Sequence, residues 1–200
     1  MAVIDDYDIL SMRIPQPEPK CGSLLIAEPM LFDGCFSRST VCIIDHSAEE
    51  GTMGLITNRN SGYLLHEIVD GIEENNEIPV FVGGPVHNER LYYLHTLGSV
   101  VPDSVEVIDG LYVGGDFECI REIINMGAIV EGKIRFFVGY SGWEKGQLRK
   151  ELDNFEWAVG QSIVADVLNL RENDAWRKAV KDMGARYKVW LNVPLDAQLN

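Results

Sequence analysis

Short apolar runs that stop at glycine constrain the fold of this chain more than any other feature. Three such runs, at residues 79–84, 111–115 and 136–140, end in Val-Gly followed by Gly or Tyr. Apolar runs this short are typical of buried β-strands. Glycine at a strand end permits the positive φ or the close backbone approach that a tight turn requires. The sequence therefore predicts three strands that meet similar corners.

Other segments carry strand or helix signals of their own. Strands are also predicted at four apolar runs: residues 23–27, 40–44, 53–57 and 91–94. Helices are predicted at four segments: residues 64–69, 116–127, 147–155 and 174–184. Asp116 and Asp174 are the predicted N-caps of two of these helices. Because strands outnumber helices and do not alternate with them regularly, an α+β fold with a mixed or antiparallel sheet is favoured over a doubly wound fold.

The chain is expected to form one domain with a peripheral arm. Its 200 residues are enough to bury a substantial core, and no Pro/Gly/Ser-rich linker interrupts residues 21–193. Pro15, Pro17 and Pro19 force an extended course before the first predicted strand. We therefore expect an N-terminal arm at residues 1–20 and a single domain at residues 21–200.

The charge balance restricts the partners of this chain. The sequence has 17 Lys and Arg residues against 31 Asp and Glu residues, which gives a formal net charge of -14. Such a field repels nucleic-acid phosphates and anionic membranes, and the sequence holds neither a dense basic patch nor a helix-turn-helix signature that would overcome it. We therefore expect no direct binding to nucleic acid.

The N-terminus and the cysteines indicate a compartment. Asp5, Asp6 and Asp8 stand where a secretory signal would carry lysines, and no segment approaches the ~20 apolar residues of a membrane span. The cysteines form no C-x-x-C pair and are expected to be reduced core residues: Cys21, Cys35, Cys42 and Cys119. These features predict a cytoplasmic protein that does not enter the membrane.

Motifs for known catalytic and cofactor sites are incomplete. Ser141 lies in Gly-Tyr-Ser-Gly-Trp, where Trp143 replaces the small residue that a nucleophile elbow needs, so a turn serine is predicted. The Gly83-Gly84-Pro85 segment lacks the Lys and Ser/Thr of a phosphate loop. The histidines show no metal-ligand spacing: His46, His66, His87 and His95. The sequence predicts neither a metal nor a cofactor.

Two groups of residues remain candidates for binding, each with two interpretations. Polar residues cluster around strands that are expected to be neighbours: Asp33, Arg38, Asp45, His46, Asn58 and Arg59. They either hold loops together through compensating charges or form a small anion site in which Arg38 or Arg59 binds a carboxylate or phosphate. Tyr140 and Trp143 either form an exposed surface for a partner or pack a corner of the core.

Several motifs in order resemble one family. They are residues 22–27 (GSLLIA) with Pro29, Asp33, residues 36–41 (FSRSTV), residues 54–59 (GLITNR), residues 83–86 (GGPV), residues 139–143 (GYSGW) and residues 146–148 (GQL). Together they resemble the AlgH (YqgE-type) family of bacterial proteins, strongly over residues 21–160 and weakly elsewhere. Asn60 departs from the family pattern, in which proline usually follows the arginine.

The resemblance implies a fold and a limited statement of function. It implies a coiled, partly barrel-like sheet with helices packed on the outside. The family has no established enzymatic activity, and its label as a transcriptional regulator comes from a proposed role in alginate synthesis. If that label holds, the charge of this chain favours action through a protein or small-molecule partner.

The sequence thus favours a non-enzymatic binding or regulatory domain, either monomeric or a weak dimer. Its candidate surface for an unknown protein or a small anionic ligand consists of Arg38, Asn58, Arg59, Gly83, Gly84, Pro85, Tyr140 and Trp143. The alternative is a redox or hydrolytic enzyme that uses Cys35 or His46 in a pocket enclosed by loops. A deep cavity with Cys35 or His46 at its wall favours the enzyme.

Overall fold

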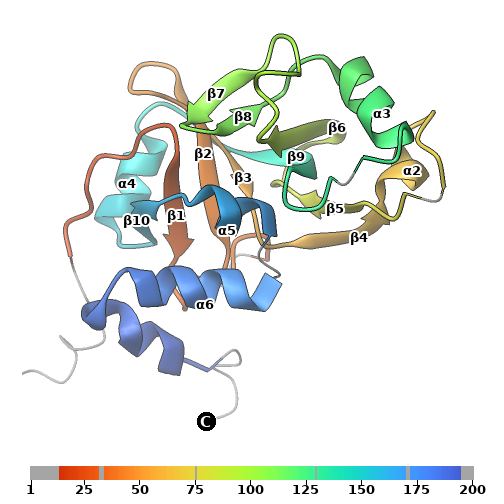
Figure 1. Ribbon diagram of the computed structural model, residues 1–200. Coiled ribbons are helices and arrows are strands. Elements are labelled where there is room, and N and C mark those ends of the chain that lie inside the picture. Colours follow the sequence, from red (N-terminus) through yellow and green to blue (C-terminus); the bar gives the residue numbers. More distant parts are fainter. Residues whose placement is uncertain (1–13, 32–33, 75, 129, 170–171, 195–200) are drawn as a thin grey trace, which may run out of the picture.

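The computed structural model describes residues 14–31, 34–74, 76–128, 130–169 and 172–194. Most of the predicted arm, residues 1–13, lies outside the described residues, and so does Asp33. The rest forms a curled sheet with helices on its outer faces (Figure 1).

The described residues form a sheet of 10 strands whose main order is β10-β1-β2-β3-β9-β6-β8-β7. The bounds are β1 Ser23–Ala27, β2 Thr40–Ser47, β3 Gly51–Ile56, β4 Asn60–Leu64, β5 Pro79–Val82, β6 Val86–His95, β7 Val105–Ile108, β8 Leu111–Val113, β9 Ile134–Trp143 and β10 Trp157–Gln161. β4 pairs with β5, and β5 joins β9 in the one parallel pairing among these strands. Antiparallel pairing elsewhere agrees with the predicted sheet.

The sheet curls until its far strand returns to the start of β1. β7 ends the strand order, yet a Cβ added to Gly22, just before β1, would lie 1.9 Å from Ile108 Cγ2 of β7. Only glycine fits this approach. A second close approach occurs inside the sheet, where a Cβ on Gly83 would lie 2.3 Å from the Gly139 carbonyl oxygen. Two of the predicted glycine corners therefore pack against each other.

Helices cover both faces of the β10-β1-β2 part of the sheet. The helical segments are α2 Leu65–Ile68, α3 Phe117–Asn125, α4 Gln147–Asp153, α5 Val164–Asn169, α6 Glu172–Asp182 and the 3₁₀ helix η1 Ala185–Asn192. Leu25 and Ala27 of β1 pack with residues of α4, whereas Ile26 between them packs with α6 and η1. Burial on both faces explains why these strands read as continuous apolar runs.

The predicted strands and helices are confirmed, with two corrections. Asp116 caps α3 as expected, since its Oδ1 accepts a hydrogen bond from the Glu118 amide at 2.9 Å. α6 begins at Glu172, so Asp174 lies inside the helix and is not its N-cap. Ser141 lies in strand β9, not in a turn, because Gly139 takes the positive φ and pairing continues to Trp143. All four cysteines are described, and none is in a disulfide.

Candidate functional site

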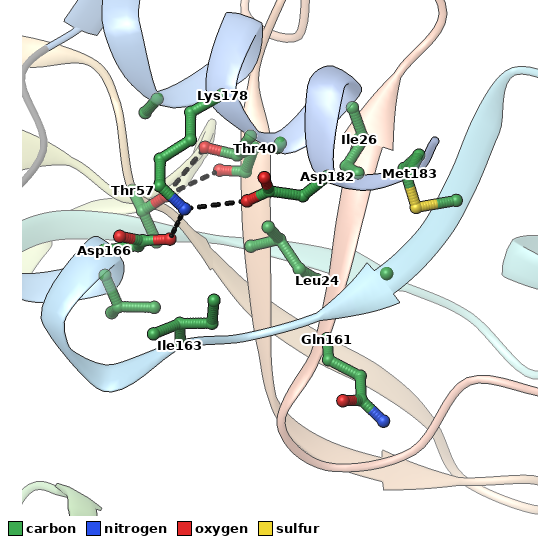
Figure 2. Close-up of a pocket in the computed structure, with 14 residues that line it drawn as sticks. Leu24, Ile26, Thr40, Thr57, Gln161, Ile163, Asp166, Lys178, Asp182 and Met183 are labelled. Atoms are coloured by element: carbon green, nitrogen blue, oxygen red, sulfur yellow. Dashed lines mark hydrogen bonds and ion pairs between the residues drawn. The ribbon is translucent and has the colours of Figure 1, made fainter. Parts of the chain in front are cut away.

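A pocket of about 570 Å³ opens between α6, α5 and the strands β10, β1 and β2 (Figure 2). β1 contributes Leu24 and Ile26, whose side chains both point to the face covered by α6 because residues two apart in a strand share a face. α6 contributes Ala175 and Ala179, and Met183 follows directly after the end of the helix, so the three residues are spaced four apart in the sequence. The side chains of alanine are short, so this face of α6 leaves space above β1.

Three charged side chains line the same pocket. Lys178 reaches from α6 across to α5, where its Nζ donates to Asp166 Oδ2 at 2.6 Å, and it also donates to Asp182 Oδ2 at 2.7 Å (Figure 2). The hydrogen bond to Asp166, followed by that to Asp182, raises the pKa of Lys178 above its usual value. Lys178 is therefore an ammonium at neutral pH.

Two threonine hydroxyls form the polar part of the pocket wall next to the strands. Thr40 Oγ1 and Thr57 Oγ1 are 2.8 Å apart, and Thr57 Oγ1 lies 3.3 Å from the carbonyl oxygen of Thr40. Both residues are buried and line the pocket. Their mutual hydrogen bond satisfies these hydroxyls without a ligand.

A buried arginine holds the α5 wall in place. Arg135 of β9 donates from Nη1 to the Val167 carbonyl oxygen of α5 at 2.6 Å. Its guanidinium carbon also lies 3.7 Å from the centre of the Phe81 ring. Burial lowers the pKa of Arg135 to about 10, so the side chain still carries its charge at neutral pH. The link fixes the helix that presents Asp166.

Arg38 and Asn58, both in the predicted surface, adjoin this pocket without lining it. Asn58 Oδ1 accepts from the Thr40 amide at 2.9 Å, and its Nδ2 donates to the Arg38 carbonyl oxygen at 3.0 Å. Arg38 Nη2 donates to the Val193 carbonyl oxygen, and the guanidinium carbon lies 5.0 Å from the Trp176 ring centre. Burial, with a smaller effect of the nearby Arg177 charge, lowers the pKa of Arg38. Asn58 thus joins the two loops by hydrogen bonds, not through the compensating charges of the first interpretation.

Arg59 and the Gly83 corner lie side by side elsewhere on the sheet. The Arg59 carbonyl oxygen accepts from the Val82 amide at 2.8 Å, and Arg59 Nη1 donates to the Gly34 carbonyl oxygen at 2.7 Å. The Gly83 carbonyl oxygen accepts from the Ile56 amide at 2.8 Å. Gly84 is buried and Pro85 is exposed. The structure therefore brings Arg59 and residues 83–85 together.

Tyr140 and Trp143 do not form an exposed pair. Tyr140 is half-buried and its ring is stacked on that of His87, with centres 5.9 Å apart. Trp143 is 5% exposed, and its Nε1 donates to Glu151 Oε2 at 2.7 Å. Trp157 donates to the same carboxylate oxygen at 2.9 Å. Trp143 thus packs a corner of the core, which is the second of the two interpretations given for it. It is therefore not part of the candidate surface.

The alternative function, an enzyme, would use Cys35 or His46. Neither residue lines the pocket beneath α6. Cys35 packs against the core that contains Trp143, and His46 Nδ1 lies 2.7 Å from Thr52 Oγ1. Burial raises the pKa of the Cys42 thiol to about 11, which keeps it from acting as a thiolate at neutral pH. Within the described ranges, no group of three His, Cys, Asp or Glu residues is placed to hold a metal ion.

Sequence reasoning missed the pocket itself. Asp166 belongs to α5, a short helix that the sequence does not predict, and Thr40 and Thr57 carry no signal beyond the two predicted strands that contain them. One local signal was present: Lys178 and Asp182 lie four residues apart on a predicted helix, which favours an ion pair. Among the described helices, none is long and apolar enough to cross a bilayer.

Comparisons with known proteins agree on one family. The family model described as AlgH-like matches residues 24–188. A UPF0301 protein of Parabacteroides distasonis is 39% identical over 183 residues, covering 91% of this chain and 92% of that protein. A UPF0301 protein of Bacteroides thetaiotaomicron is 39% identical over 189 residues, covering 94% of this chain and 95% of that protein.

Two solved structures share the fold. The solution structure of the AlgH protein from Pseudomonas aeruginosa has a TM-score of 0.71 at 24% identity and covers 90% of this chain and 98% of its own. A crystal structure of a Corynebacterium diphtheriae protein has a TM-score of 0.69 at 21% identity and covers 88% and 94%. These likenesses confirm the predicted α+β domain with its curled sheet.

Proposed function

The chain belongs to the AlgH-like family, and from this premise we propose that it is a non-enzymatic cytoplasmic protein that binds a small, largely apolar molecule in the pocket beneath α6. The observation that carries the proposal is the cavity of about 570 Å³. Small-molecule sites typically have volumes of roughly 300–1,000 Å³, apolar walls and a few convergent polar groups. This pocket has that size and that composition.

The polar groups of the pocket favour binding over catalysis. A lysine acts as a nucleophile or base when its amine is neutral, but the two carboxylates beside Lys178 hold it as an ammonium. A threonine acts as a nucleophile when a base accepts the proton of its hydroxyl. The hydroxyls of Thr40 and Thr57 instead form a hydrogen bond with each other. These groups are suited to orienting a ligand rather than to transforming it.

We propose a separate surface for a protein partner or an anion. Arg38, Arg59, Pro85 and Tyr140 are at least partly exposed there, whereas Asn58, Gly83 and Gly84 are buried beside them. In the part of the chain that the structure describes, neither Arg38 nor Arg59 forms an ion pair with a carboxylate, so both guanidinium charges remain uncompensated there. Any regulatory role would pass through this surface or the pocket, because the charge of -14 opposes direct contact with DNA.

The test is a nuclear magnetic resonance titration with 1-naphthol, an uncharged and mostly apolar probe. We expect amide shifts at Leu24, Ile26 and Gly160, which line the pocket. The variant Ala179→Leu fills the space above β1 and should abolish these shifts. Lys181→Leu adds the same side chain on the exposed face of α6 and should preserve them.

Two outcomes would overturn the proposal. One is an absence of shifts at these amides in the wild-type protein at millimolar probe. The other is a set of shifts that Ala179→Leu leaves unchanged. If Ala179→Leu fails to fold, Met183→Trp, which changes another lining residue just after the end of α6, takes its place.

A further inference from the structure

We infer that the pocket beneath α6 takes a protonated amine attached to an apolar body, with the ammonium of the ligand at Asp166. The inference rests on the proposed function, since it names the chemical class of the ligand for that site. The ligand class differs from the small anion that is one candidate for the surface at Arg38 and Arg59. It follows from the charges that the fold gathers around the cavity.

The charge count of the pocket is negative. Its charged lining residues are two carboxylates, Asp166 and Asp182, and one ammonium, Lys178, so the described wall carries a net charge of -1. The rest of the chain adds to the same sign, because the formal charge of the whole is -14. An anionic head group would enter against both fields, whereas a cationic head group is attracted by both.

Asp166 is the most sheltered of the three charged groups. Its side chain is 25% exposed, compared with 39% for Lys178 and 53% for Asp182. A charge-assisted hydrogen bond to a sheltered carboxylate is stronger than one to a carboxylate in open solvent. A ligand ammonium therefore gains most at Asp166.

Lys178 already occupies the position that the ligand ammonium would take. Its Nζ sits on Asp166 at the end of a long, flexible stem that α6 anchors (Figure 2). When a ligand ammonium binds Asp166, Lys178 can keep its other partner, Asp182, one helical turn away. Each carboxylate then faces one ammonium. An anion could accept only the third N–H of Lys178, and it would then lie beside two carboxylates that repel it.

The rest of the cavity suits an apolar body. Leu24, Ile26 and Met183 lie around it, and Ile163 lines it while 50% exposed. An aromatic or branched aliphatic group that carries an amine on a short chain would place its carbon atoms on these side chains and its ammonium on Asp166. The threonine pair offers hydroxyl oxygens as further acceptors for an ammonium, which has three donors.

The test compares three probes with similar apolar bodies and different head groups: 2-phenylethylamine, 2-phenylethanol and 3-phenylpropionate. Dissociation constants are measured by titration of the pocket amides at neutral pH. We expect the amine to bind about tenfold more tightly than the alcohol, and the carboxylate to bind more weakly than both.

Two variants of the charged residues should change the affinity for the amine in opposite directions. Asp166→Asn removes the anchor and should weaken binding of the amine by about tenfold while leaving binding of the alcohol unchanged. Lys178→Met keeps an apolar stem, frees Asp166 and should tighten binding of the amine. Glu144→Gln, an exposed residue outside the pocket, makes the same change in net charge as Asp166→Asn and should alter neither affinity.

The outcomes separate this inference from the proposed function. If the alcohol binds but the amine has no advantage over it, or if Asp166→Asn leaves that advantage intact, the inference about the amine is wrong and the pocket remains a binding site. Tight binding of the carboxylate also overturns the inference. If none of the three probes shifts the pocket amides, both the inference about the amine and the proposed function are wrong.

Discussion

Ser39 and Ser141 are both buried, yet their hydroxyls have different surroundings. Ser141 is 0% exposed and its Oγ donates to the Gly83 carbonyl oxygen at 3.0 Å, which ties β9 to the glycine corner. Ser39 is 2% exposed, and its Oγ finds no hydrogen-bond partner among the described residues. A buried hydroxyl that loses water without gaining a partner destabilises the folded state.

Removing these two hydroxyls should therefore have unequal effects on stability. Ser141→Ala should lower the free energy of unfolding by about 1–2 kcal/mol, because it removes a buried hydrogen bond. Ser39→Ala should leave the free energy of unfolding unchanged or raise it by up to about 1 kcal/mol. Urea denaturation measures both, and each variant is the control for the other because the truncation is identical. Equal losses in the two variants would contradict this account of Ser39.

His95 has a fixed tautomer because both ring nitrogens have backbone partners. The residue is 0% exposed, and its Nε2–H donates to the Gly114 carbonyl oxygen at 2.9 Å. Its Nδ1 accepts from the Leu97 amide at 3.1 Å and so carries no proton. Burial lowers the pKa of His95, and the bond to Gly114 opposes this shift only in part.

The stability of the protein should consequently fall in mild acid. The pKa of His95 is near 6.5 in the unfolded chain and lower in the folded one, so the unfolded state binds more protons between the two values. The contribution of His95 is fully present above about pH 6.5 and decreases as the pH falls toward the folded pKa. Urea denaturation at about pH 7.5 and about pH 5.5 should show a smaller pH dependence for His95→Gln than for the wild type.

A pH range above the titration of His95 provides the control. Between about pH 7.5 and about pH 8.5, the wild type and His95→Gln should show the same pH dependence. A wild-type dependence that survives unchanged in His95→Gln would show that other groups cause the loss of stability in acid.

At the scale of elements, local sequence signals predicted the strands that pack on both faces. β1, β2 and β3 read as apolar runs because α4 covers one face and α5 and α6 cover the other. β4 was missed because its residues, Asn60 to Leu64, are mostly exposed and show no alternation. Its strand conformation depends on pairing with β5. β7 and β10 are short apolar segments that were not assigned, although Trp157 at the start of β10 offered a signal.

The candidate site was less predictable than the fold because tertiary packing assembles it. Arg38 and Asn58 were found from their nearness in sequence to two neighbouring strands, and they do adjoin the pocket. The pocket itself joins Thr40, Asp166 and Lys178 from distant parts of the chain. No short-range pattern relates these three residues. α5, which supplies Asp166, is a short helix that depends on burial of Val167 and Leu168, not on a repeated apolar period.

At the scale of the whole molecule, acidic residues outnumber basic residues by 31 to 17. The described ion pairs are mostly local, such as Arg149 with Asp153 and Arg121 with Glu118, each within one helix. Four of the 17 Lys and Arg residues take part in the described ion pairs, and most of the 31 Asp and Glu residues do not. The resulting field is negative over long distances at low ionic strength, where the screening length reaches about 30 Å.

This negative field predicts that the protein does not bind a nucleic-acid duplex. Proteins that grip a duplex neutralise several phosphates with Lys and Arg and release counterions, so their binding is strongest at low salt. In this chain, low salt strengthens the repulsion between the phosphates and the charge of -14. Fluorescence anisotropy with a labelled duplex of about 30 base pairs in about 20 mM salt should therefore show no binding at micromolar protein.

The salt series of that experiment distinguishes a real contact from an artefact. Binding through phosphates would weaken linearly with the logarithm of salt concentration, and such a slope would overturn the prediction. Such binding would come from the guanidinium groups of Arg38 and Arg177, which lie close enough for each charge to affect the other. The double variant Arg38→Gln/Arg177→Gln would then abolish the slope. Without a slope, a regulatory role for this fold has to act through the pocket or through another protein.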